Sequence, residues 1–450
     1  MMRTVLVAVA MLGLMAAGGS AHAEMGTIDA VPAATLLLPY FEVNLNDVNG
    51  VTTLFSINNA SATAVLAHVT LWTDQGIPTF NFDVYLTGYD VQTINIRDIF
   101  NGILPVTADD GADPGDTSSP SSGISNQGLL SQDINFPGVT GPCGDPSTLY
   151  NAPDPTLPAK IAHIKNAHTG QFSAILNGCS GSNYGDGLAR GYITVDTVNS
   201  CTLLFPSDPG YFQSVATFQN ALWGDYFFVD SSQNFAQGDN LVHIEACQPG
   251  NGFIGVGNGA GHCPLAPGDY SFYARYVAGA AADQREPLAT TYATRYLNGG
   301  NFDGGTSLLV WRDTKLPPSG PAGVHNCAVP GPPAWFPLSQ TDVVSFDEEE
   351  NATDQCFLTD NVAPVIGGVQ SCFPLATQRI STQGGNVIAE DMNITTNFGW
   401  LYLNLNFSIA GDLFPGVAQS WVHTVMDAEG RFSVGFAAIQ LARPPRFAPS

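Results

Sequence analysis

The chain has 450 residues, and its 14 Lys and Arg against 39 Asp and Glu give a formal net charge of −25. This length is enough for two or three domains with hydrophobic cores. A surface this negative repels phosphate backbones and anionic lipids, so we expect neither nucleic acid nor an acidic membrane as a partner. Charged residues make up only 12%, whereas Gly (48) and Pro (31) are abundant. Such a composition is typical of many short strands joined by turns.

Residues 1–23 have the pattern of a secretory signal peptide. Arg3 precedes an apolar run over residues 5–17, and Ala21-His22-Ala23 offers a cleavage site. The run is too short for a membrane span, and no second run of about 18 apolar residues follows. Removal of this segment takes away one Arg and leaves a formal net charge of −26. We therefore expect an exported chain without a membrane span, in a compartment where thiols oxidise.

Alternation of apolar and polar residues is the main secondary-structure signal. It runs through residues 65–71, 80–86 and 401–409, and it predicts half-buried antiparallel strands. Gly76 marks a turn between the first two runs, and a phase slip at Thr93-Ile94 indicates a bulge or bend. Gly430 ends a four-residue hairpin turn after Met426 and is expected at positive φ. Further strands are expected over residues 191–196, 226–230, 241–246, 270–276, 420–426 and 431–441, whereas helical periodicity is weak and best around residues 284–297.

These signals predict an all-β fold of one or two antiparallel β-sandwiches with long, loop-rich, disulfide-bonded insertions. The expected divisions are sandwich strands over residues 24–106, a loop-rich acidic and Pro/Gly segment over 107–170, a disulfide-containing β-rich region over 171–300, and a C-terminal sandwich over 301–450. Residues 52–58 weakly resemble residues 306–312 in sequence, and residues 69–74 weakly resemble residues 343–348. If this resemblance reflects a duplication, the chain holds two related sandwich modules with an insertion between them.

All eight cysteines follow the signal segment, and an even count in an exported chain suggests four disulfides. Cys247 and Cys263 enclose a Gly-rich loop whose closure would stabilise the fold by about 3 kcal/mol, so they are the first expected pair. Cys356 with Cys372 is the second. The pairing of the remaining cysteines stays open: Cys143, Cys179, Cys201 and Cys327.

Two phrases near the N-terminus resemble the start of bacterial exported immunoglobulin-like modules. They are Phe55-Ser56-Ile57-Asn58-Asn59-Ala60-Ser61 and Ala67-His68-Val69-Thr70-Leu71-Trp72-Thr73-Asp74-Gln75-Gly76. Phrases such as Leu222-Trp223-Gly224-Asp225-Tyr226 also resemble an uncharacterised family of exported proteins of Gram-negative bacteria. The resemblance implies immunoglobulin-like sandwiches and export to the periplasm, the cell surface or the medium. It implies no activity and no site residues.

Familiar catalytic and cofactor motifs are absent from the sequence: there is no G-x-S-x-G, H-E-x-x-H or C-x-x-C. His163 and His168 are expected to be exposed, and His243, His262 and His325 to be polar groups beside disulfide cysteines. Calcium is the most credible ion, because clustered carboxylates supply hard oxygen ligands. The first candidate cluster comprises Asp109, Asp110, Asp113 and Asp116. Two further clusters are residues 347–350 and residues 44–49, and none of the three fits an EF-hand.

The sequence favours an exported, non-catalytic sandwich protein with a structural, adhesive or binding role, whose partner is an unidentified protein or glycan. One alternative is a hydrolase that acts on extracellular polymers through paired carboxylates. Another is a ligand-binding protein stabilised by calcium. No other cofactor is expected.

Overall fold

The structure is a computed structural model, which describes residues 31–105, 157–200, 202–248, 252–253, 270–276, 283–314, 327, 338–355, 372–383, 392, 394–407, 414 and 416–442. The expected signal peptide, the Asp109–Asp116 cluster, His262, His325 and four of the cysteines lie outside these residues. Within them, no helix has the length and apolar character needed to cross a membrane.

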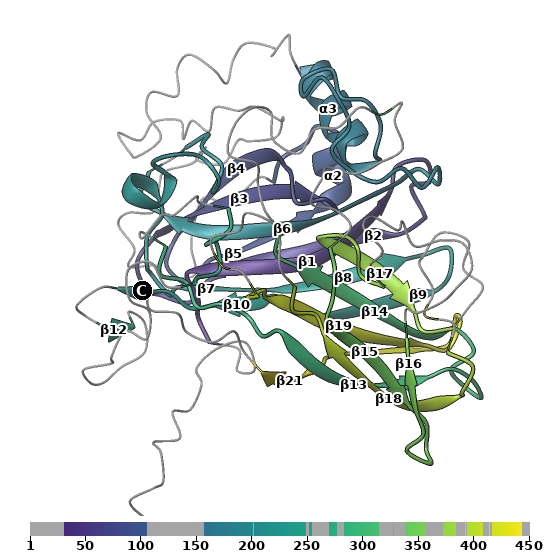
Figure 1. The fold of residues 1–450 in the computed structure, drawn as a ribbon. Coiled ribbons are helices and arrows are strands. Elements are labelled where there is room, and N and C mark those ends of the chain that lie inside the picture. The colour runs from purple at the N-terminus through teal and green to yellow at the C-terminus, as the bar shows by residue number, and fades with distance from the viewer. Residues whose placement is uncertain are drawn as a thin grey trace, which may run out of the picture.

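Antiparallel sheets are the main regular secondary structure of the described chain, and helices are few, which confirms the predicted all-β sandwich class (Figure 1). The first module pairs a sheet of order β10-β1-β6-β3-β4 with a sheet of order β5-β2-β8-β9. Its strands are β1 (Thr35–Asn44), β2 (Thr52–Asn59), β3 (Val65–Thr73), β4 (Pro78–Leu86), β5 (Val91–Asn95), β6 (Leu188–Val198), β8 (Asp225–Asp230), β9 (Phe235–Asn240) and β10 (Val242–Ile244).

The second module repeats this topology strand for strand. Its sheets have the orders β21-β13-β18-β15-β16 and β17-β14-β19-β20, so each of nine strands has the same neighbours as its counterpart in the first module. These strands are β13 (Thr291–Leu297), β14 (Gly305–Arg312), β15 (Asp342–Phe346), β16 (Ala352–Asp354), β17 (Thr377–Ser381), β18 (Phe398–Asn404), β19 (Ser420–Asp427), β20 (Ser433–Ala437) and β21 (Ile439–Ala442). The described strands therefore form two nine-strand sandwiches with the same strand order, as the predicted duplication would produce.

The strand registers align the two modules residue by residue. Thr35, Asp196 and His68 face one another across β1, β6 and β3, and Thr291, Asn404 and Asp342 do so across β13, β18 and β15. On this alignment Val69 corresponds to Val343, as the sequence resemblance predicts. For β2 and β14 the sequence match is one residue out of register with the structure. Asn58 pairs with the first residue of β5 and Trp311 with the first residue of β17, so these two residues are equivalent.

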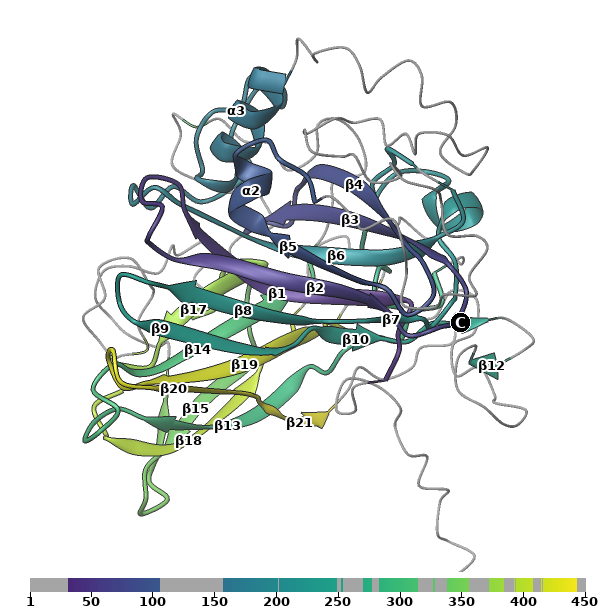
Figure 2. The same ribbon diagram turned by 180° about the vertical axis from the view of Figure 1, so that it is seen from behind.

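Elements outside the duplicated frame belong mostly to the first module. They are α2 (Ile96–Phe100), α3 (Leu157–His168), a π-helical turn (Tyr211–Val215), β7 (Leu222–Trp223) and the β11 (Cys247–Gln248) and β12 (Gly252–Phe253) pair. Both helices lie at one end of the first module, where α3 packs on β4 and β6 (Figure 2). Other segments of the chain cover both faces of the five-stranded sheet. As a result β3 is buried along its whole length.

The two modules share an apolar interface. Leu309 and Trp311 of β14 and Trp421 of β19 point away from the second module's core and join the core of the first. Trp311 lies edge-on to Tyr192 of β6, with ring centres 6.0 Å apart. At the other side, β9 and β20 run side by side (Figure 2), and Ser433 donates a hydrogen bond to the carbonyl oxygen of Ala236. Relative motion of the modules would expose this apolar surface, so the pair forms one packed body.

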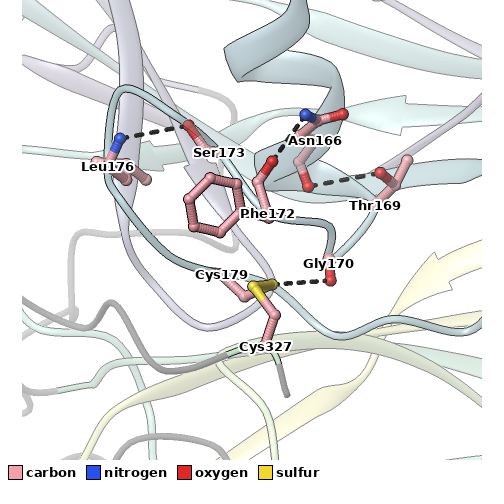
Figure 3. Close-up of a disulfide and its surroundings, with 8 residues drawn as sticks. All are labelled: Asn166, Thr169, Gly170, Phe172, Ser173, Leu176, Cys179 and Cys327. Carbon is pink, nitrogen blue, oxygen red and sulfur yellow. Dashed lines mark hydrogen bonds between the residues drawn. A yellow bond between two sulfur atoms is a disulfide. The ribbon is translucent and has the colours of Figure 1, made fainter.

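A disulfide between Cys179 and Cys327 ties the segment after α3 to the connection between β14 and β15 (Figure 3). The bond therefore links the two modules. Cys247 and Cys372 are also disulfide-bonded. The expected pairs Cys247–Cys263 and Cys356–Cys372 each include a cysteine outside the described residues and stay predictions.

Residues 291–297, which lie in the segment of weak helical periodicity, form β13, in which Tyr292, Thr294 and Tyr296 alternate into the core. Two other local predictions are wrong. Residues 270–276 form turns and not a strand. The phase slip at Thr93-Ile94 is not a bulge: β5 pairs with β2 in unbroken register, and α2 starts at Ile96. Gly430 has the predicted positive φ, at 69°.

Candidate functional site

A polar cleft of about 910 Å³ lies where the two modules meet. One side comes from β1, β6 and the segment before β6, and the other from β14, β17, β19 and the β19–β20 turn. Clefts between domains are common ligand sites. The lining residues are Tyr40, Glu42, Asn44, Tyr184, Asp186, Leu188, Arg190, Gln233, Gly304, Ser307, Leu375, Thr377, Gln378, Arg379, Ser381, Asp427, Glu429 and Gly430.

Glu42 is the central charged group of the first-module side. It pairs in register with Arg190 on the neighbouring strand, which brings the two side chains to the same face of the sheet. Tyr40 donates a hydrogen bond of 3.0 Å to Glu42 Oε2, and Arg190 Nη2 lies 3.9 Å from Oε1. Burial, together with the charge of Glu42, raises the pKa of Tyr40 well above its usual value, so this phenol stays a donor. The Glu42 carboxylate is thus held in place, with its side chain 11% exposed.

Arg190 is fixed from two further directions. Its guanidinium forms a two-pronged ion pair with Asp186, at 3.1 and 2.5 Å. It also lies over the ring of Tyr184, 4.6 Å from the centroid. Although burial opposes it, the hydrogen bonds from Arg190 and from the Leu188 amide lower the pKa of Asp186. A planar guanidinium restrained in this way presents a preformed binding surface.

The second-module side presents Arg379 and Asp427. On β17, Ile380 points into the core, so its neighbour Arg379 points out into the cleft, with its Nη1 3.9 Å from Glu42 Oε2. Burial raises the pKa of Asp427, and the charges of Glu429 and Asp303 add to it, outweighing Arg379. Arg379 therefore interacts with a carboxylate on each side. Phe302 and Phe432, which contact edge to face at 5.5 Å, flank this end of the second module, and Phe432 is 49% exposed.

Two of the predicted calcium clusters lie in turns that the protein's own hydrogen bonds hold together. Asp47 belongs to the β1–β2 turn, whose carbonyls at Val48, Gly50 and Val51 accept hydrogen bonds from Arg97. Asp347 caps the β15–β16 turn by accepting from the amides of Glu349 and Asn351. Among the described residues, no three His, Cys, Asp or Glu side chains converge as a metal site requires. The cluster Asp109, Asp110, Asp113 and Asp116 lies outside the described part of the chain.

The prediction that His163 and His168 are exposed is wrong. Both are buried where α3 packs on the first module, and both hydrogen-bond to Thr79. Burial lowers the pKa of His168 to about 3 and that of His243 to about 4. These imidazoles are neutral structural groups at ordinary pH.

A second charged cluster is sealed inside the first module. Asp196 accepts hydrogen bonds from Thr35, Tyr211 and Tyr273, and Arg285 Nε lies 3.3 Å from its carboxylate. His68 and Asp83 contact each other at 2.5 Å beside it. All four ionisable side chains are 0% exposed, so no ligand reaches them. This cluster fixes the segments packed over the sheet and is not a candidate site.

Sequence reasoning did not predict the residues of the cleft. A signal was present, because Glu42, Arg190 and Arg379 are isolated charges inside otherwise buried strands of a chain with few cations. Such charges usually mark a function or an ion pair. Their meeting depends on how the modules pack, which no local pattern encodes. Comparisons with models of protein families, with curated proteins and with solved structures find no match to this chain.

Proposed function

We propose that the chain is an exported binding protein of two immunoglobulin-like sandwich modules, at the cell surface or in the periplasm of a Gram-negative bacterium. Its cleft between the modules would hold a hydroxyl-rich ligand, such as a segment of a glycan. The signal-like segment 1–23, the disulfide and the acidic surface support export. The pairing of the second strand with the fifth and of the third with the sixth matches the B–E and C–F pairs of immunoglobulin domains. The first and seventh strands pair differently.

The observation on which this proposal rests is that neighbouring side chains already hold the charged groups of the cleft in fixed positions. Glu42 and Arg190 are already held by Tyr40 and Asp186, so a ligand would meet groups whose positions are fixed in advance. Preorganised carboxylates, guanidiniums and amides suit hydroxyl groups, which both donate and accept hydrogen bonds. The partial mutual neutralisation of these charges favours an uncharged ligand over a strongly charged one.

Calorimetric titration with a panel of neutral oligosaccharides tests the proposal. Glu42→Gln and Arg379→Gln should each weaken binding about tenfold or more, since a hydrogen bond to a charged group contributes about 1.5–3 kcal/mol. Glu348→Gln, a change of the same kind in the exposed β15–β16 turn, should leave binding unchanged. The proposal fails if no member of the panel binds, or if the three variants behave alike.

A second candidate function is hydrolysis of an extracellular polymer in the same cleft. It is favoured by the placement of carboxyl groups on both sides of the cleft, Glu42 on one and Asp427 on the other, and by the burial that raises the pKa of Asp427, because glycoside cleavage uses two carboxyl groups in different environments. Release of reducing ends from a neutral polysaccharide would support it. Asp427→Asn should then abolish release while oligosaccharide binding persists; release that survives this change would exclude Asp427 as the acid.

Stabilisation by calcium stays a separate prediction that rests on Asp109, Asp110, Asp113 and Asp116. Thermal melts with calcium and with EDTA test it, and an unchanged midpoint would remove it.

A further inference from the structure

The outer face of the second module's five-stranded sheet carries a row of aromatic side chains, of which Phe398 and Trp400 are exposed. Along β18, Leu401 and Leu403 point into the core, so Phe398, Trp400 and Tyr402 point outward at intervals of about 7 Å. Phe398 is 40% and Trp400 37% exposed. Phe346 of β15 lies directly opposite Trp400 in the sheet. We call these four residues the aromatic face: Phe346, Phe398, Trp400 and Tyr402.

The surroundings of the aromatic face are mixed. Arg295 of β13 lies over the ring of Trp400, 4.6 Å from the centroid, and extends the planar surface. Ile439 on β21 is 55% exposed and adds apolar area. One row further along the sheet, the outward residues are Asp342 and Asn404, which provide hydrogen-bonding groups at the margin. Exposed apolar surface with a polar rim marks an interaction site.

The equivalent face of the first module's five-stranded sheet is covered by other parts of the chain. In the first module Trp72 pairs in register with Tyr192, four residues along the strands from the His68–Asp196 pair. In the second module Phe346 pairs with Trp400, four residues from the Asp342–Asn404 pair. The two aromatic pairs are therefore at equivalent positions. In the first module this aromatic pair is fully buried. Tyr276 and Trp311 cover it, with ring centres 5.2 Å from Trp72 and 6.0 Å from Tyr192, respectively. In the second module Trp400 is 37% exposed and Phe346 is half-buried.

A second copy of the chain is a poor occupant of this open face. In the contact between the two modules, Leu309 and Trp311 of β14 form the apolar ridge that packs against the first module. The equivalent residues on β2 of the first module are the polar Ser56 and Asn58. The first module thus lacks the apolar ridge that a copy would need to repeat the internal contact. Two chains with a net charge of −25 each also repel one another, as do anionic polymers and membranes. These two arguments favour an uncharged occupant that is not a sandwich of this kind.

We propose that the aromatic face binds a neutral polysaccharide chain. A sugar ring offers a face of C–H groups, which packs on the negative face of an aromatic ring, and a rim of hydroxyl groups. Successive sugar rings would stack along Phe398, Trp400 and Tyr402 while hydroxyls meet Asp342 and Asn404. This site is separate from the cleft and does not depend on the function proposed for it.

Affinity electrophoresis of the full chain through gels containing hydroxyethyl cellulose, laminarin or dextran tests the proposal. At least one of these neutral polysaccharides should retard the wild-type protein, and heparin should not. Trp400→Ala should weaken retardation about 10- to 100-fold, because it removes most of one aromatic contact area. Phe227→Ala is the matched control: it removes a 46% exposed ring from β8 of the first module and should change nothing.

Three results would overturn the proposal: no retardation by any of the three polymers, retardation that Trp400→Ala leaves intact, or a wild-type dimer in sedimentation that Trp400→Ala converts to monomer. The last would make the face a contact between copies. Tyr402→Phe, which keeps the ring, should retain binding and guards against loss through misfolding. Glu42→Gln separates the two sites, since it should affect oligosaccharide binding in the cleft and leave retardation unchanged.

Discussion

Asp74 should make the protein less stable as the pH rises from 4 to 7. This side chain lies in the β3–β4 turn, is 3% exposed, and accepts hydrogen bonds of 3.0 and 3.2 Å from the amide of Ser182. Burial raises the pKa of Asp74 to about 6 from 3.8, despite those hydrogen bonds. Between these two pH values the folded state binds more protons than the unfolded state, so the free energy of unfolding falls as pH rises.

The size of the effect follows from the shift. A difference of about two pKa units corresponds to about 3 kcal/mol, which is present below pH 4 and lost above pH 6. Asp74→Asn removes the titration and keeps an acceptor for Ser182. The free energy of unfolding of the variant, minus that of the wild type, should therefore increase by about 2–3 kcal/mol between pH 4 and pH 7.5.

Urea unfolding of both proteins at the two pH values measures this difference, and the subtraction cancels the contributions of all other titrating groups. Asn183→Ser, at an exposed position that carries no titrating group before or after the change, should give a difference that is the same at both pH values. A flat difference for Asp74→Asn as well would refute the reasoning, because it would mean that Asp74 keeps its unfolded pKa in the folded protein.

Three further predictions concern the contact between the modules and the packing of α3 on the first module. Replacing Cys179 and Cys327 with Ser should lower the free energy of unfolding by about 5 kcal/mol, since the bond closes a loop of 148 residues; a loss below 1 kcal/mol in urea titration would contradict this. Trp311→Ala should cost about 3–5 kcal/mol, and the wild type should unfold in one calorimetric transition; two separate transitions would contradict a shared core. The imidazole NMR signals of His168 should not shift between pH 7.5 and pH 5, because its depressed pKa lies near 3; a midpoint near pH 6.5 would show that it is exposed.

The sequence predicts strands well where one face meets a core and the other meets solvent. It fails at β13, although Tyr292, Thr294 and Tyr296 alternate, because the preceding residues add a competing helical pattern. It does not predict α3, whose cover over β4 and β6 comes from tertiary packing and not from a strong amphipathic pattern.

The repeated strand order is visible in the sequence only where equivalent residues share the same apolar or polar character, as at Val69 and Val343. Elsewhere the equivalent positions changed with their surroundings. His68 and Asp196, buried under Tyr211 and Tyr273, correspond to the exposed Asp342 and the half-buried Asn404. Divergence of this kind removes sequence similarity while leaving every strand neighbour in place.

The same divergence explains where the candidate sites lie. In the first module the outer sheet face is occupied by the rest of the chain, and the cleft forms at the end of that contact, where Glu42 and Arg190 meet Arg379. Because Trp311 joins the two modules in a common core, we expect the cleft to keep its shape without a ligand, so that the proposed binding would not require ordering of the walls. In the second module, none of the described segments covers Trp400 on the equivalent face. A single repeated frame therefore yields two different surfaces: one made by the contact of the modules and one left open by its absence.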